Sequence, residues 1–84
     1  MIETGLKDKV VIVTGAAAGF GLATAERFAA EGCRVAAWDV NEAPDSAGVF
    51  QKVNVADAGE VEAAVADVVD RWGAVYALVN NAGI

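Results

Sequence analysis

Three glycines between Thr14 and Gly21 have the spacing of a turn that can bind an anion. An apolar, β-branched run precedes them and a run of good helix formers follows. A strand that turns into a helix through glycines directs backbone N–H groups and the positive end of the helix dipole into one crevice, which suits a phosphate. Gly15 allows the sharp turn, Gly19 lets an anion approach the backbone, and Gly21 lets the helix pack close to the sheet. The alternative is a glycine- and alanine-rich turn that binds no ligand.

Asp39 is the second residue whose position suggests chemistry. It ends the next apolar run, eighteen positions after Gly21, where a carboxylate can accept hydrogen bonds from ribose hydroxyls. At ~4 Å it would repel a 2′-phosphate by roughly 1 kcal/mol in water and roughly 4 kcal/mol in a partly shielded site. The flanking candidates for a compensating cation, Ala18 and Val40, carry no charge. Together the glycine turn and Asp39 favour NAD over NADP, and the alternative is a solvent-facing Asp at the end of a strand.

Composition restricts the classes of function. The 84 residues make at most one small domain, yet 56% of them are hydrophobic, which is more typical of the interior of a larger protein. The net charge of −6 argues against nucleic acid or an anionic membrane as a partner. One cysteine, Cys33, excludes an internal disulfide and predicts a reducing, cytoplasmic location. The sequence has no His, no leader with a basic and then an apolar part, no long apolar span and no metal-ligand spacing.

The alternation of apolar segments with helical patterns predicts an α/β fold with a doubly wound parallel sheet. A helix cap is expected at Asp57, with Glu60 three residues on. Asn41–Gly48 reads as a loop, which is shorter than the usual crossover between parallel strands, so a hairpin is the alternative there. The expected strands are Lys9–Val13, Arg34–Trp38, Val49–Val55 and Val75–Val79, and the expected helices are Leu22–Glu31 and the segment from the Asp57 cap to Trp72.

Four motifs together resemble the short-chain dehydrogenase/reductase family. They are Thr14-Gly-Ala-Ala-Ala-Gly-Phe-Gly21, Asp39, Asn54-Val55 and Asn80-Asn81-Ala82-Gly83, and they have the family's order and spacing over Leu6 to Ile84. The resemblance implies a Rossmann-like sheet with strand order 3-2-1-4, here a partial sheet truncated after the fourth strand. It also implies an oxidoreductase that uses NAD, with NADP the less favoured cofactor, and that acts on a small alcohol or ketone.

The resemblance also assigns the parts of the cofactor site. Gly15, Ala17, Ala18, Gly19 and Phe20 would hold the pyrophosphate and ribose, beside the helix packing that we attribute to Gly21. Asp39 and Val40 would flank the adenosine ribose, Asn54 and Val55 would meet the adenine, and Asn81, Ala82 and Gly83 would line the cofactor cleft. The sequence departs from the family in having Asn54 where many members carry Asp, Phe20 in place of an aliphatic residue, and a short loop at Asn41–Gly48.

The family's proton-transfer groups, a Ser and a Tyr and Lys four residues apart, have no counterpart here. The single tyrosine, Tyr76, has Asn80 four positions later and lies in an expected strand, so we interpret it as a core or interface residue. We therefore expect residues 1–84 to be the N-terminal part of one NAD(P)-binding domain of a longer oxidoreductase, and to be inactive alone. The alternatives are a stand-alone NAD-binding module without catalysis and an interaction module that uses a bare sheet edge. Because Val75–Val79 would be that edge, we expect self-association through it.

Overall fold

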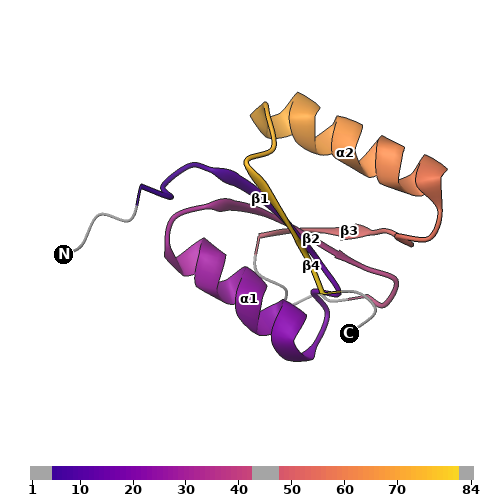
Figure 1. Cartoon of the computed structure of the whole chain (residues 1–84), viewed down its shortest axis with the longest axis horizontal. Coiled ribbons are helices and arrows are strands. Elements are labelled where there is room, and N and C mark those ends of the chain that lie inside the picture. Colours follow the sequence, from indigo (N-terminus) through magenta and orange to yellow (C-terminus); the bar gives the residue numbers. More distant parts are fainter. Residues whose placement is uncertain (1–4, 43–47, 82–84) are drawn as a thin grey trace.

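The apolar segments form parallel strands, and the helical patterns between them form helices on the two faces of the sheet (Figure 1). The computed structural model describes residues 5–42 and 48–81. Within them the elements are β1 (Val10–Thr14), α1 (Gly19–Ala30), β2 (Arg34–Asp39), β3 (Val49–Lys52), α2 (Ala58–Trp72) and β4 (Ala77–Asn80).

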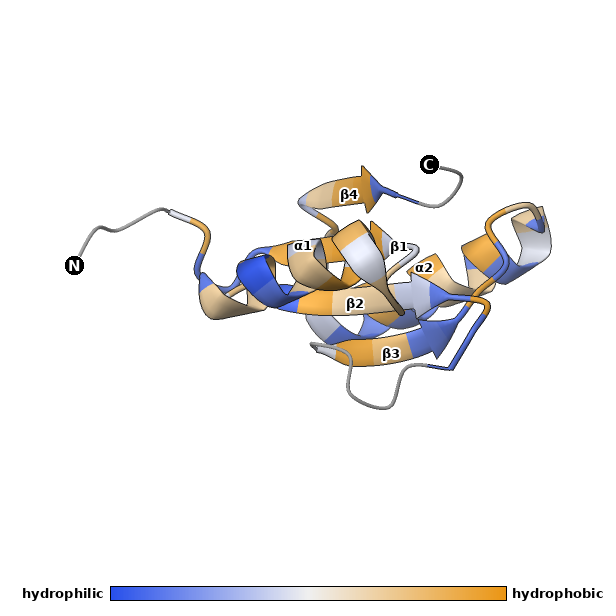
Figure 2. Ribbon diagram, turned by 90° about the horizontal axis from the view of Figure 1, so that it is seen from below, coloured by the Kyte–Doolittle hydropathy of each residue, from blue (hydrophilic) through white to orange (hydrophobic). Residues whose placement is uncertain are grey.

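The strand order is β3-β2-β1-β4 and every neighbouring pair is parallel, which confirms the predicted order. The hairpin alternative for β2 and β3 is therefore wrong. Figure 2 shows β3 and β4 at opposite edges of the sheet. All five residues of β1 are buried because the strand has a partner on each side and a helix over each face. This explains why β1 is a continuous apolar run rather than an alternating one.

Two apolar clusters, one on each face, hold the helices to the sheet. Alternate residues of a strand point to opposite faces, so neighbours such as Val11 and Ile12 belong to different clusters. On the α2 face the buried residues are Val10, Ile12, Ala36, Trp38, Val53, Ala64 and Val68, and on the α1 face they are Val11, Val13, Ala16, Ala25, Val35 and Ala37. Trp72 packs against the α2 cluster, as its position at the end of an apolar stripe predicts.

The helix ends follow the capping signals of the sequence. The Asp57 carboxylate accepts from the Glu60 N–H at 3.0 Å, which confirms the predicted N-cap of α2. The Glu60 carboxylate accepts from the Asn54 N–H at 3.0 Å, so it ties the helix to the segment after β3. Gly32 and Gly73 follow the two helices with φ angles of 86° and 90°, which side chains rarely adopt. Helix α1 begins at Gly19, three residues before the expected start.

Two expectations about the strands are wrong. β3 ends at Lys52, not at Val55, because the chain turns after Val53: the Asn54 side-chain oxygen accepts from the Ala56 N–H at 3.0 Å. Tyr76 lies just before β4 rather than within a strand and is 59% exposed, so the core alternative is wrong and the interface alternative stays a prediction. Its N–H donates to the Val10 carbonyl, and the Lys9 ammonium lies 5.2 Å from the centre of its ring. In residues 5–42 and 48–81 neither helix is long and apolar enough to cross a membrane.

Candidate nucleotide-binding site

The carboxyl ends of the strands meet at one edge of the sheet because all the strands run in the same direction. The turn from β1 to α1 lies at this edge, as do Asp39 at the end of β2 and Asn80 at the end of β4 (Figure 1). In open α/β sheets, ligands bind in the crevice outside this edge. The topology therefore brings together three of the four sequence motifs at the ends of their strands, and the fourth, Asn54-Val55, follows β3 at the same edge.

The three glycines of the turn differ in backbone conformation and in the space around them. Gly15 and Gly19 have φ angles of 63° and 60°, in the left-handed region. A Cβ at Gly19 would meet no atom of the described chain within 4 Å, so the space beside this backbone is open. A Cβ at Gly21 would lie 1.8 Å from the Gly15 carbonyl oxygen, so Gly21 is what allows α1 to start directly against the turn.

The N-terminal end of α1 has no side-chain cap. Ala18 occupies the capping position in an extended conformation and makes no side-chain hydrogen bond, and the first turn has no acidic residue. The first N–H groups of an α-helix have no partner within the helix, and the dipole gives this end a partial positive charge. Phe20, in the first turn, is 83% exposed. These features leave the end of the helix suited to an anion.

Asp39 is joined to the glycine turn by a hydrogen bond. One carboxylate oxygen accepts from the Ala17 N–H at 2.9 Å, and the other accepts from the Asn41 N–H at 2.9 Å. These bonds fix the orientation of the carboxylate, and each oxygen keeps a lone pair for a further donor. Lys52 of β3 is the register partner of Asp39. The sequence analysis considered only Ala18 and Val40 as positions for a cation beside Asp39. It missed Lys52 because this residue comes from a neighbouring strand.

A hollow of about 80 Å³ lies beside Asp39 at the carboxyl ends of β1, β2 and β3. Its lining contains five residues that the sequence assigned to the cofactor and two that it did not. The assigned residues are Gly15, Asp39, Val40, Asn54 and Val55, and the additional ones are Trp38 and Val53. Trp38 and Val53 each precede an assigned residue directly, and this adjacency is the signal that could have identified them.

The side chain of Asn54, which we predict to meet the adenine, already has a hydrogen-bond partner within the chain. The side-chain oxygen of Asn54, which could accept from the adenine amino group, accepts from the Ala56 N–H at 3.0 Å. Because an amide oxygen has two lone pairs, one remains. Val40 and Val55 are 51% and 44% exposed, so the mouth of the hollow presents apolar side chains to solvent.

Thr14 connects the ends of β1 and β4. Its hydroxyl donates to the Asn80 side-chain oxygen at 2.9 Å and accepts from the Asn81 N–H at 2.9 Å. The Asn81 side-chain nitrogen is buried and has no hydrogen-bond partner among the described residues. The structure thus places Asn81 next to the turn that begins after β1. Ala82 and Gly83 lie outside the described residues. In the part of the chain that is described, no group of three or more His, Cys, Asp or Glu side chains could hold a metal ion.

Comparison with known proteins identifies the family. The family model described as short chain dehydrogenase matches residues 9–84. The chain belongs to the short-chain dehydrogenase family. It corresponds to the N-terminal portion of the fold, with the Rossmann-like parallel sheet of that portion. The family uses nicotinamide dinucleotides, and its members are oxidoreductases.

Several relatives show how much of the family's length is present. The chain is 43% identical to 2-(R)-hydroxypropyl-CoM dehydrogenase of Xanthobacter autotrophicus, over 92% of this chain and 36% of that protein. It is 36% identical to levodione reductase of Leifsonia aquatica, over 96% of this chain and 35% of the reductase. Ligand-free aldohexose dehydrogenase of Thermoplasma acidophilum superposes with a TM-score of 0.92 at 37% identity, over 99% of this chain and 32% of that one. The chain thus spans about a third of the length of these relatives.

Proposed function

We propose that this chain binds the adenosine and pyrophosphate parts of NAD, as the N-terminal part of an oxidoreductase that acts on an alcohol or ketone. The observation that carries the proposal is the 2.9 Å hydrogen bond between the Asp39 carboxylate and the Ala17 N–H. It fixes a ribose-binding group directly against an anion-binding turn, at the rim of a hollow. The names of the relatives include both dehydrogenases and a reductase, which supports an alcohol or ketone as the substrate class.

The residues of the turn and the hollow fit the proposed cofactor. The open space beside Gly19 and the uncapped start of α1 would hold the pyrophosphate. Asp39 would accept from the adenosine ribose, with Val40, Asn54 and Val55 around the base. Asn81, beside Thr14, would approach the cofactor from the end of β4. When bound, NAD supplies or accepts the hydride.

The choice of NAD over NADP depends on the charge of Asp39. A carboxylate held in place by hydrogen bonds from Ala17 and Asn41 would repel a 2′-phosphate bound beside it. Lys52 is the register partner of Asp39 on the neighbouring strand β3, and its positive charge would reduce this repulsion, although the two side chains form no ion pair among the described residues. We therefore expect a preference for NAD rather than complete exclusion of NADP.

The 84 residues contain no group that we can assign to proton transfer at the substrate. Tyr76, the single tyrosine, lies at the amino end of β4, away from the site at the carboxyl ends. We therefore expect this chain alone to give no measurable carbonyl reduction with NADH. A cytoplasmic location remains a prediction that rests on the single Cys33.

The experiment that tests the proposal is calorimetric titration with NAD and with NADP. Asp39→Ala should weaken NAD binding by roughly tenfold or more, the value of hydrogen bonds to a charged acceptor. It should also reduce the preference for NAD over NADP. Asp70→Asn is the control, because it removes one negative charge from an exposed position on α2.

The same titrations separate the alternative functions. If Asp39→Ala and Asp70→Asn bind NAD as the parent chain does, Asp39 does not hold the ribose. If the parent binds neither dinucleotide, the proposed function is wrong and an interaction module that uses the edge of β4 becomes the better explanation. A chain that binds NAD, and whose natural gene product has only these 84 residues, would instead be a stand-alone NAD-binding module.

A further inference from the structure

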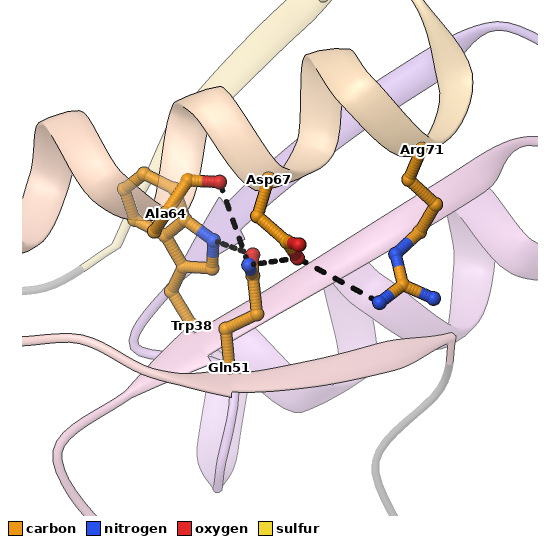
Figure 3. A network of polar contacts seen from close by, with 5 residues as sticks. All are labelled: Trp38, Gln51, Ala64, Asp67 and Arg71. Atoms are coloured by element: carbon orange, nitrogen blue, oxygen red, sulfur yellow. Dashed lines mark hydrogen bonds and ion pairs between the residues drawn. The ribbon is translucent and has the colours of Figure 1, made fainter.

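Trp38 is one of the residues that line the hollow, and its indole is hydrogen-bonded to a side chain of the neighbouring strand. Trp38 is 2% exposed and belongs to the apolar cluster on the α2 face. Its ring N–H donates to the Gln51 side-chain oxygen at 2.7 Å (Figure 3). A buried indole N–H nearly always has such a partner. The indole N–H therefore has its acceptor within the protein and does not need one from a ligand in the hollow.

The Gln51 amide is itself fixed by α2. Its nitrogen donates to the Asp67 carboxylate at 3.0 Å and to the Ala64 carbonyl at 3.4 Å. The Asp67 carboxylate also lies 3.6 Å from the Arg71 guanidinium (Figure 3). Because both acceptors face the amide nitrogen, the amide oxygen must point toward Trp38. One chain of polar contacts thus runs from the surface of α2 to the wall of the hollow.

We infer that Gln51 is a positioning residue for nucleotide binding, and that it acts by holding Trp38, one of the residues that line the hollow, in place. The inference rests on the proposed function. Gln51 does not line the hollow, so it acts only through Trp38. Without the Gln51 oxygen the indole N–H has to find another partner, either by moving the ring or by admitting water. Both changes alter the shape of a hollow of about 80 Å³.

The test follows Trp38 fluorescence in a Trp72→Phe background, where Trp38 is the single tryptophan of the chain. The probe is adenosine 5′-monophosphate, which contains only the parts of the cofactor assigned to this site. We expect the probe to change the Trp38 emission. Gln51→Leu should shift the emission of the free protein and weaken the probe's affinity by roughly threefold to tenfold, the range for one lost hydrogen bond.

A paired substitution distinguishes positioning from a general loss of stability. Gln51→Glu keeps an acceptor for Trp38 but places two carboxylates together, so it should weaken binding. Adding Asp67→Asn lets the side chain at position 67 donate to the new carboxylate at position 51. Trp38 emission and the probe's affinity should therefore recover relative to Gln51→Glu alone, but not fully, because the Ala64 carbonyl has lost its donor. Asp67 has a half-exposed side chain on α2, so this exchange leaves the apolar core unchanged and still tests the inference if Gln51→Leu does not fold.

The outcomes separate this inference from the proposed function. If the parent chain binds neither adenosine monophosphate nor NAD, the proposed function fails, and this inference fails with it. If the parent binds and Gln51→Leu lowers only the midpoint of unfolding, with affinity and Trp38 emission unchanged, Gln51 is merely structural. Failure of Asp67→Asn to restore the affinity lost in Gln51→Glu would also overturn the inference.

Discussion

Gly21→Ala tests whether the close packing of α1 on the glycine turn is required by the fold. The added Cβ would lie 1.8 Å from the Gly15 carbonyl oxygen and 2.5 Å from its carbon. Ordinary contact begins near 3.4 Å, so the helix and the turn would have to separate by about 1.6 Å, the difference between these distances. Both of these neighbours are backbone atoms, which cannot move aside by a change of rotamer.

The expected cost follows from two opposing terms. Overpacking of a well-packed site costs ~1–3 kcal/mol, and this clash should lie at the upper end of that range. Replacing Gly by Ala inside a helix stabilises the helix by up to about 1 kcal/mol. We therefore expect a net loss of about 2 kcal/mol, roughly a thirtyfold change in the folding equilibrium. The shift would also move the first N–H groups of α1 away from Gly15 and weaken NAD binding.

The assay is urea unfolding followed by circular dichroism, with Gly59→Ala as the matched control. Gly59 also lies in the first turn of a helix, and a Cβ there would meet only the Asp57 side-chain oxygen, at 3.3 Å. The same substitution should therefore be neutral or stabilising by up to about 1 kcal/mol. If Gly21→Ala is as stable as the parent chain, the close approach of α1 to the turn is not a constraint on this fold.

Three further predictions concern the turn, the sheet edge and the cysteine. Gly19→Val should abolish NAD binding while helix content falls only modestly, because the side chain would occupy the open space beside the turn. Gly73 is the control: it has a positive φ and an equally open position at the other end of the sheet, so Gly73→Val should retain binding. The chain should self-associate through β4, because Leu78 is 59% exposed on an edge strand with no outer partner among the described residues. In sedimentation experiments Leu78→Lys should reduce this self-association, whereas the control Val69→Lys on α2 should not. Burial, and to a smaller extent the charge of Glu31, raise the pKa of the Cys33 thiol. Alkylation of Cys33 by iodoacetamide should therefore accelerate at a higher pH than alkylation of a cysteine peptide does. Glu31→Gln should lower the pH at which the alkylation of Cys33 accelerates. A compact monomer, or a Cys33 profile equal to that of the peptide, would contradict the last two.

The sequence by itself determined which segments form strands and helices and where the glycine turn lies. The glycine spacing after a buried run predicted the turn, because only glycine tolerates both the positive φ at Gly19 and the contact at Gly21. Asp57 predicted the start of α2 because a cap depends on residues only three positions apart. Asp39 could be placed at the end of β2 for a similar reason, since a short apolar run has few possible boundaries. The match of these motifs to the family's order supplied the strand order before any tertiary contact was known.

Only the tertiary structure decided how neighbouring strands meet. The segment after Asp39 is shorter than a usual crossover, so its length does not decide whether β2 and β3 pair in parallel. The register of this pair makes Lys52 the partner of Asp39 and places Gln51 beside Trp38. The 16-residue separation of Gln51 and Asp67 has no local periodicity that could reveal their contact. Such contacts depend on the packing of α2 across two strands, which arises from burial of apolar side chains. A sequence pattern records which face is apolar, whereas the partner across that face is fixed only when the layers pack together.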